Sequence, residues 1–402
     1  MKSRLVLSLL ATAGVIVSGP AAATNGYFSH GYGIKAKGMA GVGIALPQDA
    51  LAAATNPAGM VLVGDRIDVG ADWFAPNRGA TAPPLGAIEG NGVSGFLIPE
   101  FGYNRALNAD SSLGVSVYGN GGMNTEYAIT PFGPPGSGKG GMNMSQLFIA
   151  PTYALQLNDQ HAVGVALNLA YQQFKAYGLQ GFMGMSATPS AVTNNSYDTS
   201  TGWGLRVGWT GQLTPDLTVG ATYQSITQMS TFDKYAGLFA EQGGFDIPSN
   251  YGLGVSYKIN AATTVAADVQ AIQYSDVASV NNPMISPGQL GDANGPGFGW
   301  QDMTVIKLAL THQYDNGLLL RAGYSTNEQP IPSDETMFNV IAPGVVQDHL
   351  TLGATWTLAN QAELSVSYMH AFEHKVTGSG AAAGYDLHMY EDSIGVAYGW
   401  KL

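Results

Sequence analysis

The chain contains no cysteine, and charged side chains make up only 11% of its 402 residues. The lack of cysteine excludes a disulfide framework, a thiolate metal site and a cysteine nucleophile. Soluble domains carry roughly 25% charged residues, so a water-exposed surface of this size would be undercharged. The hydrophobic fraction of 45% is ordinary. Much of the surface is therefore expected to face a solvent other than water.

Basic residues are also scarce, with 16 Lys and Arg against 28 Asp and Glu, a formal charge of -12. Nucleic-acid binding needs clustered basic side chains for the phosphates, so this class of partner is excluded. Residues 133–140 nearly match a nucleotide-binding P-loop, but Gly140 stands where Ser or Thr should be. The run from 142 to 156 then alternates like a strand, so we expect an outside loop and no cofactor.

Long apolar runs are absent except near the N-terminus. There Lys2 and Arg4 precede an apolar stretch over residues 5–17, and Pro20 with alanines 21–23 follows. Thirteen residues are too few for a spanning helix, which needs roughly 20. The pattern predicts a secretory signal peptide over residues 1–23, with cleavage after Ala23.

Glycine and amphipathic aromatics are abundant, with 54 Gly, 20 Tyr and 6 Trp. This composition disfavours long helices. A secreted, cysteine-free, Gly- and Tyr-rich chain without a spanning helix indicates a bacterial outer-membrane β-barrel. Barrel strands have about ten residues with apolar side chains at alternate positions. The last segment fits best, since one of its faces carries Ile394, Val396, Tyr398, Trp400 and Leu402. Residues 250–259 and 361–373 repeat this pattern.

Short polar turns and long loops alternate between these strands. The turns are 108–110, 158–160, 214–216, 260–262, 315–317 and 359–361, and the loops expected outside are 76–96, 124–143, 178–199, 230–247, 276–302, 327–346 and 374–388. Twelve strands flank the turns, and a first strand (66–75) and a last strand (389–402) bring the count to 14. An even number is what a single-chain barrel requires, although one miscounted hairpin would give 12 or 16.

Residues 24–65 do not alternate and need another explanation. Apolar side chains favour burial over a disordered leader, and they include Met39, Val42, Ile44, Leu46, Leu51, Met60, Val61 and Leu62. Residues 47–54 could form two helical turns that end before Asn56 and Pro57. A 14-stranded barrel is wide enough to hold a small plug. We therefore predict an all-β fold, a 14-stranded antiparallel transmembrane β-barrel over residues 66–402 with an N-terminal hatch over residues 24–65.

Several short motifs stand in a recognisable order and spacing. They are Gly31-Tyr32-Gly33, Gly38-Met39-Ala40-Gly41, Asp49-Ala50 and Asn56-Pro57-Ala58-Gly59, then Leu320-Arg321-Ala322-Gly323-Tyr324 followed by Pro330 and Pro332. With them the sequence resembles the FadL/TodX family of outer-membrane transporters for long-chain fatty acids and hydrocarbons, over essentially the whole mature chain. The resemblance implies a hatch, an outer groove, an inner apolar pocket and sideways exit of ligand into the bilayer.

One departure concerns the last residue, which is Leu402 where such barrels usually end in Phe. Leu402 continues the row of apolar residues at alternate positions, so only its recognition by the barrel-assembly machinery is in question. The other expected partners are a hydrophobic small molecule and outer-membrane lipid. A monomer is the default for a closed, plugged barrel.

Two groups of residues are candidates for gating. The first is the hatch turn Asn56, Pro57, Ala58 and Gly59, whose plain alternative is a turn that only ends a helix. The second is the glycine cluster Gly119, Gly121 and Gly122 in the third strand. Glycine in a strand often marks a bulge, and the resemblance implies an inward kink here that opens a lateral exit.

Two further groups are candidates for ligand contact. Three basic residues stand at strand positions expected to face the lumen, namely Arg206, Lys307 and Arg321. They could receive a ligand carboxylate, or they could pair with acids such as Asp268 and Glu363. Four phenylalanines near loop bases could form the outer apolar groove, although interface-belt aromatics are an alternative. They are Phe174, Phe182, Phe232 and Phe239.

The sequence thus predicts a passive outer-membrane transporter for long-chain fatty acids or related hydrophobic compounds, with no reaction catalysed. An aromatic-hydrocarbon channel of the same family is the main alternative. A general porin would need an unplugged lumen. A lipid hydrolase would need a nucleophile and an exposed histidine such as His374 or His388, and no nucleophile motif accompanies them.

Overall fold

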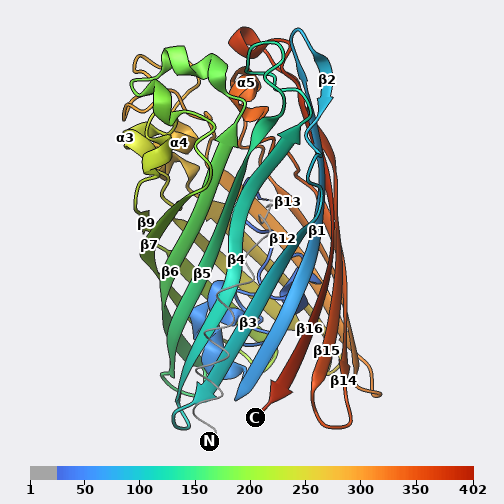
Figure 1. Cartoon of the computed structure of the whole chain (residues 1–402). Helices are drawn as coiled ribbons and strands as arrows, with labels where there is room; N and C mark the ends of the chain where they lie inside the picture. The colour runs from blue at the N-terminus through green and yellow to red at the C-terminus, as the bar shows by residue number, and fades with distance from the viewer. Residues whose placement is uncertain (1–24) are drawn as a thin grey trace, which may run out of the picture.

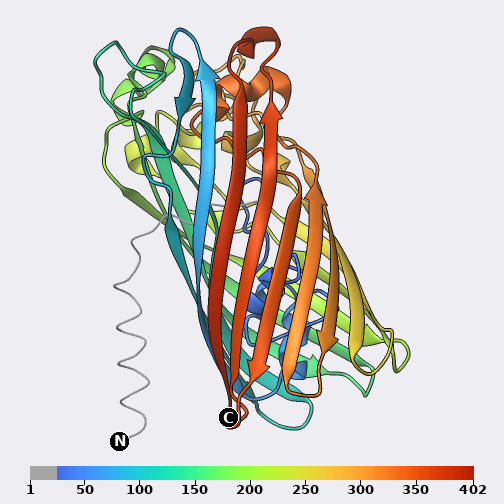
Figure 2. The same ribbon diagram turned by 90° about the vertical axis from the view of Figure 1, so that its right-hand side faces the viewer.

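The protein is a closed antiparallel β-barrel in a computed structural model that describes residues 25–402. The expected signal peptide, residues 1–23, lies outside the described residues. Fourteen long strands form the wall (Figures 1 and 2). Their bounds are β1 (Arg66–Ala82), β3 (Phe96–Ala106), β4 (Ser111–Tyr127), β5 (Gly140–Gln156), β6 (His161–Tyr177), β7 (Asp198–Gln212), β8 (Leu217–Gln224), β10 (Asn250–Lys258), β11 (Thr263–Ile272), β12 (Met303–Gln313), β13 (Leu318–Asn327), β14 (His349–Thr357), β15 (Glu363–Val376) and β16 (Leu387–Lys401).

The first and last strands close the ring. β1 pairs with β16 from Arg66 opposite Lys401 to Ala80 opposite Leu387. Two short strands, β2 (Gly86–Glu89) and β9 (Gln228–Met229), extend the sheet at β1 and β7. All six predicted turns join neighbouring strands, as residues 107–110 join β3 to β4.

The alternation of apolar and polar residues along the sequence matches the alternation of outward-facing and inward-facing side chains in the barrel wall. On β16, Ile394 is 58% exposed, whereas the preceding Ser393 is 4% exposed. A barrel in a bilayer presents apolar side chains outward and keeps its interior polar or filled. Because the side-chain period of a strand is two residues, the register alone determines which side chains face lipid.

Several strands extend beyond the predicted membrane length on the loop side. β1 continues to Ala82, where the sequence prediction ended at 75, and β4 and β5 extend into the predicted loop 124–143. The prediction used the thickness of the bilayer, but backbone groups that remain paired above the membrane still gain from the ladder. The loop region therefore begins with a rim of paired strands.

The long loops carry short helices that gather at one end of the barrel, away from the C-terminus (Figure 1). They are η4 (Gln180–Met185), η5 (Pro189–Ala191), η6 (Asp233–Tyr235), α3 (Ala240–Gly243), η7 (Tyr274–Asp276), α4 (Ala278–Asn281), η8 (Ser333–Glu335), α5 (Thr336–Asn339) and η9 (Gly380–Ala382). Between residues 25 and 402, no helix has both the length and the apolar character to span a membrane.

Residues 25–65, called the N-terminal segment from here on, are buried along most of their length and contact opposite parts of the wall. Helix α2 (Ile34–Lys37) contacts β14, β15 and β16, whereas η3 (Pro57–Leu62) contacts β5, β6 and β7. In Figure 2 this blue segment is seen between the strands of the barrel.

The prediction of two helical turns over residues 47–54 was wrong. Only the three-residue helix η2 (Ala52–Ala54) forms there. The Asp49 side chain accepts a hydrogen bond from the Leu51 N–H (3.0 Å), a local turn that competes with a helix. Asn56, predicted to lie in a hatch turn or merely to end a helix, caps the helix η3, because its side chain accepts from the Ala58 N–H with Pro57 in the first turn.

Candidate functional site

One stretch of the wall lacks strand pairing. The ladder between β3 and β4 ends at Phe101 opposite Val117, although β4 continues to Tyr127 and β3 begins at Phe96. The register of β4 also shifts between Gly119 and Gly121. Residues 96–100 of β3 and 118–123 of β4 are therefore not joined, and we call this stretch the wall gap.

The N-terminal segment supplies the missing partner. Phe28 pairs with Gly121 as an isolated antiparallel bridge. The Ser29 N–H donates to the Asn120 carbonyl (2.9 Å), and the Gly122 N–H donates to the Tyr27 carbonyl (3.0 Å). Residues 25–29, called the gap strand below, thereby satisfy backbone groups that a free strand edge would leave unpaired inside the wall.

Arg78 of β1 bounds the wall gap on its outer side. Its guanidinium donates to the backbone carbonyl and the side chain of Asn124 in β4, and also to the Val93 carbonyl (2.7 Å). The same group lies over the Phe96 ring at 5.7 Å. β1 and β4 are thus tied together by a side chain where β3 no longer joins them.

A small apolar pocket, with a cavity volume of about 30 Å³, lies among the outer loops. Ser279 is the one polar side chain among its lining residues, which are Met142, Phe174, Phe182, Leu238, Phe239, Ser279, Leu290, Pro296, Gly297, Phe298, Phe338 and Ile341. Three of the four phenylalanines proposed for an outer groove line it. The fourth, Phe232, packs behind them with its ring centroid 5.7 Å from that of Phe174.

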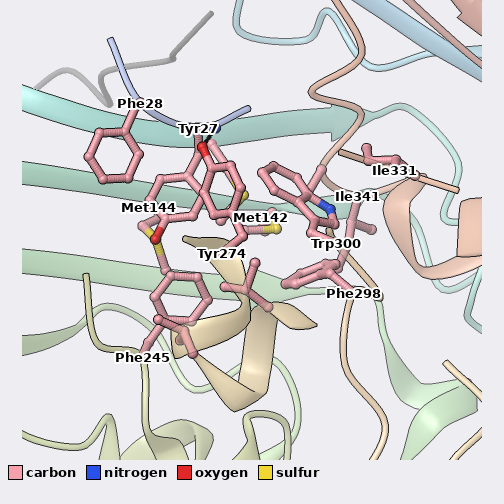
Figure 3. Packing of buried hydrophobic residues seen from close by; sticks show 14 of the residues in the cluster. Tyr27, Phe28, Met142, Met144, Phe245, Tyr274, Phe298, Trp300, Ile331 and Ile341 are labelled. Carbon is pink, nitrogen blue, oxygen red and sulfur yellow. Dashed lines mark hydrogen bonds between the residues drawn. The ribbon is translucent and has the colours of Figure 1, made fainter. Parts of the chain in front are cut away.

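A cluster of buried aromatic rings connects this pocket to the wall gap (Figure 3). The ring centroid of Phe239, which lines the pocket, lies 4.9 Å from that of Phe245. The Phe245 centroid lies 5.9 Å from that of Tyr27 in the gap strand. Tyr27 also contacts Tyr274 (5.2 Å) and Trp300 (5.8 Å). An apolar molecule leaving the pocket toward the gap would meet aromatic surface throughout.

The turn at Asn56 is fixed against the opposite wall. Its amide nitrogen donates to the carbonyls of Ile44 (2.7 Å) and Trp209 (3.0 Å). Gly208 and Gly164 make room for this turn, because a Cβ atom on either would overlap Asn56, Pro57 or Ala58. One side chain therefore joins two parts of the N-terminal segment to β7.

The three predicted cations lie on the wall but do not line the pocket. Arg206 donates to the Thr55 carbonyl (3.0 Å), and Lys307 donates to the His30 carbonyl (3.1 Å). Arg321 donates to the Gln48 side chain (3.1 Å). Each cation therefore binds the N-terminal segment. The alternation along a strand predicts that these side chains face the lumen, but it does not reveal what they bind there.

The inward acids bind the same segment from other sides. Glu363 pairs with Lys35 of α2 and with Arg66 of β1, and Lys37 pairs with Asp72. Asp268 accepts hydrogen bonds from the N–H groups of Gly43 (2.8 Å) and Ile44 (3.1 Å). The wall thus holds the N-terminal segment through cations and carboxylates alike.

Residues 14–398 match the sequence model of a family described as "Outer membrane protein transport protein (OMPP1/FadL/TodX)". The chain belongs to this family. It is similar to long-chain fatty acid transport proteins from Escherichia coli O6:H1 (24% identity, covering 71% of this chain and 72% of that one) and Salmonella typhi (23%, covering 93% and 94%). Family membership and the closed barrel place the protein in the outer membrane.

Solved members of the OMPP1/FadL/TodX family share this fold. The Pseudomonas putida toluene transporter TodX superposes with a TM-score of 0.71 at 19% identity, over 93% of this chain and 99% of that one. A FadL homologue from Pseudomonas aeruginosa gives a TM-score of 0.71 at 14% identity, over 94% and 99%. At these identities the likeness shows the barrel architecture.

Proposed function

We propose that this protein is a passive transporter that takes long-chain fatty acids or related hydrophobic compounds into the outer membrane and releases them sideways into the bilayer. The observation that carries the proposal is the wall gap, which is closed by the gap strand and connected by aromatic side chains to an apolar pocket. The printed names of the relatives support it, since they are fatty-acid and toluene transporters.

Lateral release suits an apolar cargo. A hydrophobic molecule that leaves through the wall enters lipid directly and avoids the unfavourable step of entering periplasmic water. In this scheme Gly119, Gly121 and Gly122 form the exit kink, because the bulge there ends the pairing with β3. Displacement of the gap strand opens the exit.

The N-terminal segment acts as the hatch in this proposal, with residues 1–23 as a cleaved signal peptide and residues 66–402 as the barrel. Asn56, Pro57, Ala58 and Gly59 form the turn that anchors the hatch to β7. Salt bridges hold α2 on the other side of the barrel. In this scheme the middle of the hatch stays fixed, and its first residues, the gap strand, are the part that is displaced.

Arg206, Lys307 and Arg321 are proposed to receive a ligand carboxylate after the hatch shifts. In the closed state they donate to neutral oxygens of the hatch. A carboxylate forms a charge-assisted hydrogen bond that is roughly twice as strong, so it would compete for these donors. A neutral hydrocarbon would not, and the uncharged pocket suits that cargo equally well.

The other classes have less support. A general porin is disfavoured because residues 25–65 are largely buried inside the barrel and contact opposite parts of its wall. A hydrolase is disfavoured because, within residues 25–402, no hydroxyl is hydrogen-bonded to His374 or His388. We propose that the protein works as a monomer, inserted by the barrel-assembly machinery, without a cofactor and without catalysing a reaction.

Equilibrium binding to the purified barrel tests the cargo. A long-chain fatty acid should bind and be displaced by its methyl ester and by an alkylbenzene. In Lys307→Met, affinity for the acid should fall while affinity for the ester stays. Lys139→Met, in an exposed loop far from the hatch, is the matched control. Absence of binding by all three probes would contradict the proposed function.

A further inference from the structure

The hydroxyl group of Tyr274 binds the gap strand at two points. It donates to the Asn25 carbonyl (2.5 Å) and accepts from the Tyr27 N–H (3.2 Å). Tyr274 belongs to η7, in the outer loop after β11, nearly 250 residues away in sequence. The side chain is fully buried. A single outer-loop atom thus contacts the strand that closes the wall gap.

The chain is shaped to permit this contact. Gly26 lies between the two bonded residues with a φ of +64°, and a Cβ atom there would overlap the Tyr274 hydroxyl and the Trp300 ring. Any other residue would be strained by that φ and would push the strand away from Tyr274. Beyond its turn between Asn25 and Phe28, the gap strand is otherwise held by the β4 backbone.

Tyr274 does not line the apolar pocket but is connected to it through Trp300. Its ring packs edge-on against Trp300 at 5.1 Å. The Trp300 indole N–H donates to the Asn339 side chain (2.6 Å), which in turn donates to the carbonyl of Phe298 (2.7 Å). Phe298 lines the apolar pocket. A ligand that displaces Phe298 therefore acts on the group packed against Tyr274.

We propose that Tyr274 is the positioning residue for the exit step, a latch whose hydroxyl keeps the gap strand in the wall until a hydrophobic ligand fills the pocket. The inference rests on the proposed function, since it assigns the trigger for lateral release. Ligand entry repacks Phe298 and Trp300, Tyr274 turns away from Asn25 and Tyr27, and the gap strand leaves Gly121.

Tyr274→Phe removes the latch and keeps the ring. The matched control is Tyr235→Phe, because Tyr235 is also fully buried in a one-turn helix of an outer loop. Its hydroxyl donates to the Ser196 carbonyl (2.7 Å) and accepts from the Ala176 N–H (3.0 Å), without touching the gap strand. Each variant loses one bond to a backbone carbonyl and one from a backbone N–H, and Tyr235→Phe also loses a longer contact to the Ala176 carbonyl (3.4 Å).

A single cysteine reports on the gap strand directly. Asn25 is 1% exposed and the chain has no other thiol, so Asn25→Cys gives a buried reporter in an otherwise unreactive protein. Thiol labelling should be slow in the parent, faster by about tenfold with Tyr274→Phe, and unchanged with Tyr235→Phe. A saturating alkylbenzene should speed labelling of the parent and add little to Tyr274→Phe.

Transport measurements separate this inference from the proposed function. Tyr274→Phe should raise alkylbenzene affinity by no more than about tenfold, because a ligand that favours the released gap strand binds more tightly once the latch is removed. It should also speed release of the alkylbenzene into the lipid of proteoliposomes. Equal labelling in the two tyrosine variants would overturn the latch, whatever the transport result. Faster labelling without faster release would support the latch and overturn the lateral exit on which the proposed function depends.

Discussion

Gly121 of β4 and Tyr27 of the gap strand approach each other so closely that a Cβ atom on residue 121 would overlap the carbonyl oxygen of Tyr27. The glycine in the kink therefore does more than bend a strand. It lets a second backbone occupy the place that β3 has left, so the wall gap and its closure depend on the same position.

Gly121→Val should block exit while leaving pocket binding intact. The branched side chain would itself occupy the opening that the gap strand leaves, so the exit stays blocked even with the strand displaced, at an overpacking cost of about 1–3 kcal/mol in stability. Binding of a fluorescent fatty acid and its transfer into lipid would be measured in the same proteoliposomes. Gly184→Val is the control, since a Cβ at Gly184 meets open space. Loss of binding in a folded Gly121 variant would count against a pure exit role.

Asn56→Ala should loosen the N-terminal segment, the proposed hatch. The substitution removes the helix cap and leaves the carbonyls of Ile44 and Trp209 without their donor, which should lower the free energy of unfolding by roughly 2–4 kcal/mol. Urea unfolding followed by tryptophan fluorescence would measure it. Asn260→Ala removes a similar pair of bonds from an exposed turn and should cost less than about 1 kcal/mol. Unchanged ligand uptake at equal surface expression would contradict a gating role for Asn56.

Acid should destabilise the packing of the N-terminal segment through His30. Burial, together with the nearby His349, Lys307 and Lys37, lowers the pKa of His30 well below its usual 6.5. The unfolded chain binds a proton as the pH falls below 6.5 and the folded chain does not, so stability decreases by up to about 1.4 kcal/mol per pH unit below that point.

Thermal unfolding between pH 5 and 8 would test this dependence. His30→Phe keeps a ring against His349, whose centroid lies 5.5 Å away, and removes the titrating group. Its midpoint should therefore fall less steeply in acid than that of the parent. His374→Gln, outside the N-terminal segment, should follow the parent. Parallel curves for the parent and His30→Phe would rule out this contribution.

The number of strands, the positions of the turns and the face of the wall on which each side chain lies could be predicted from the sequence, because each depends on local periodicity. Ile394 and Ser393 lie on opposite faces for no reason beyond their order along a strand. The cluster at Gly119, Gly121 and Gly122 was likewise visible, since glycine in a strand signals a bulge. The structure places a register shift there.

Contacts across the lumen carried no such signal. Lys307 was placed in the lumen phase, but its bond to the His30 carbonyl depends on the path of a segment without periodicity. Tyr274 lies just before the predicted loop 276–302, and no sequence pattern distinguishes it from the other tyrosines. Only Gly26, the third residue after the expected cleavage site, could have hinted at a close approach, and it carries no motif.

The pairing of Tyr27 with Tyr274 also constrains how the protein can be made. The N-terminal segment is among the first parts of the chain to be synthesised, yet its partners include strands from β4 to β16. Contacts at such separation in sequence form late, because the entropy of closing the loop must be overcome first. The segment therefore has to wait, unpaired, until the last strands fold around it. During insertion into the membrane, closing β1 on β16 and docking these first residues become a single final step.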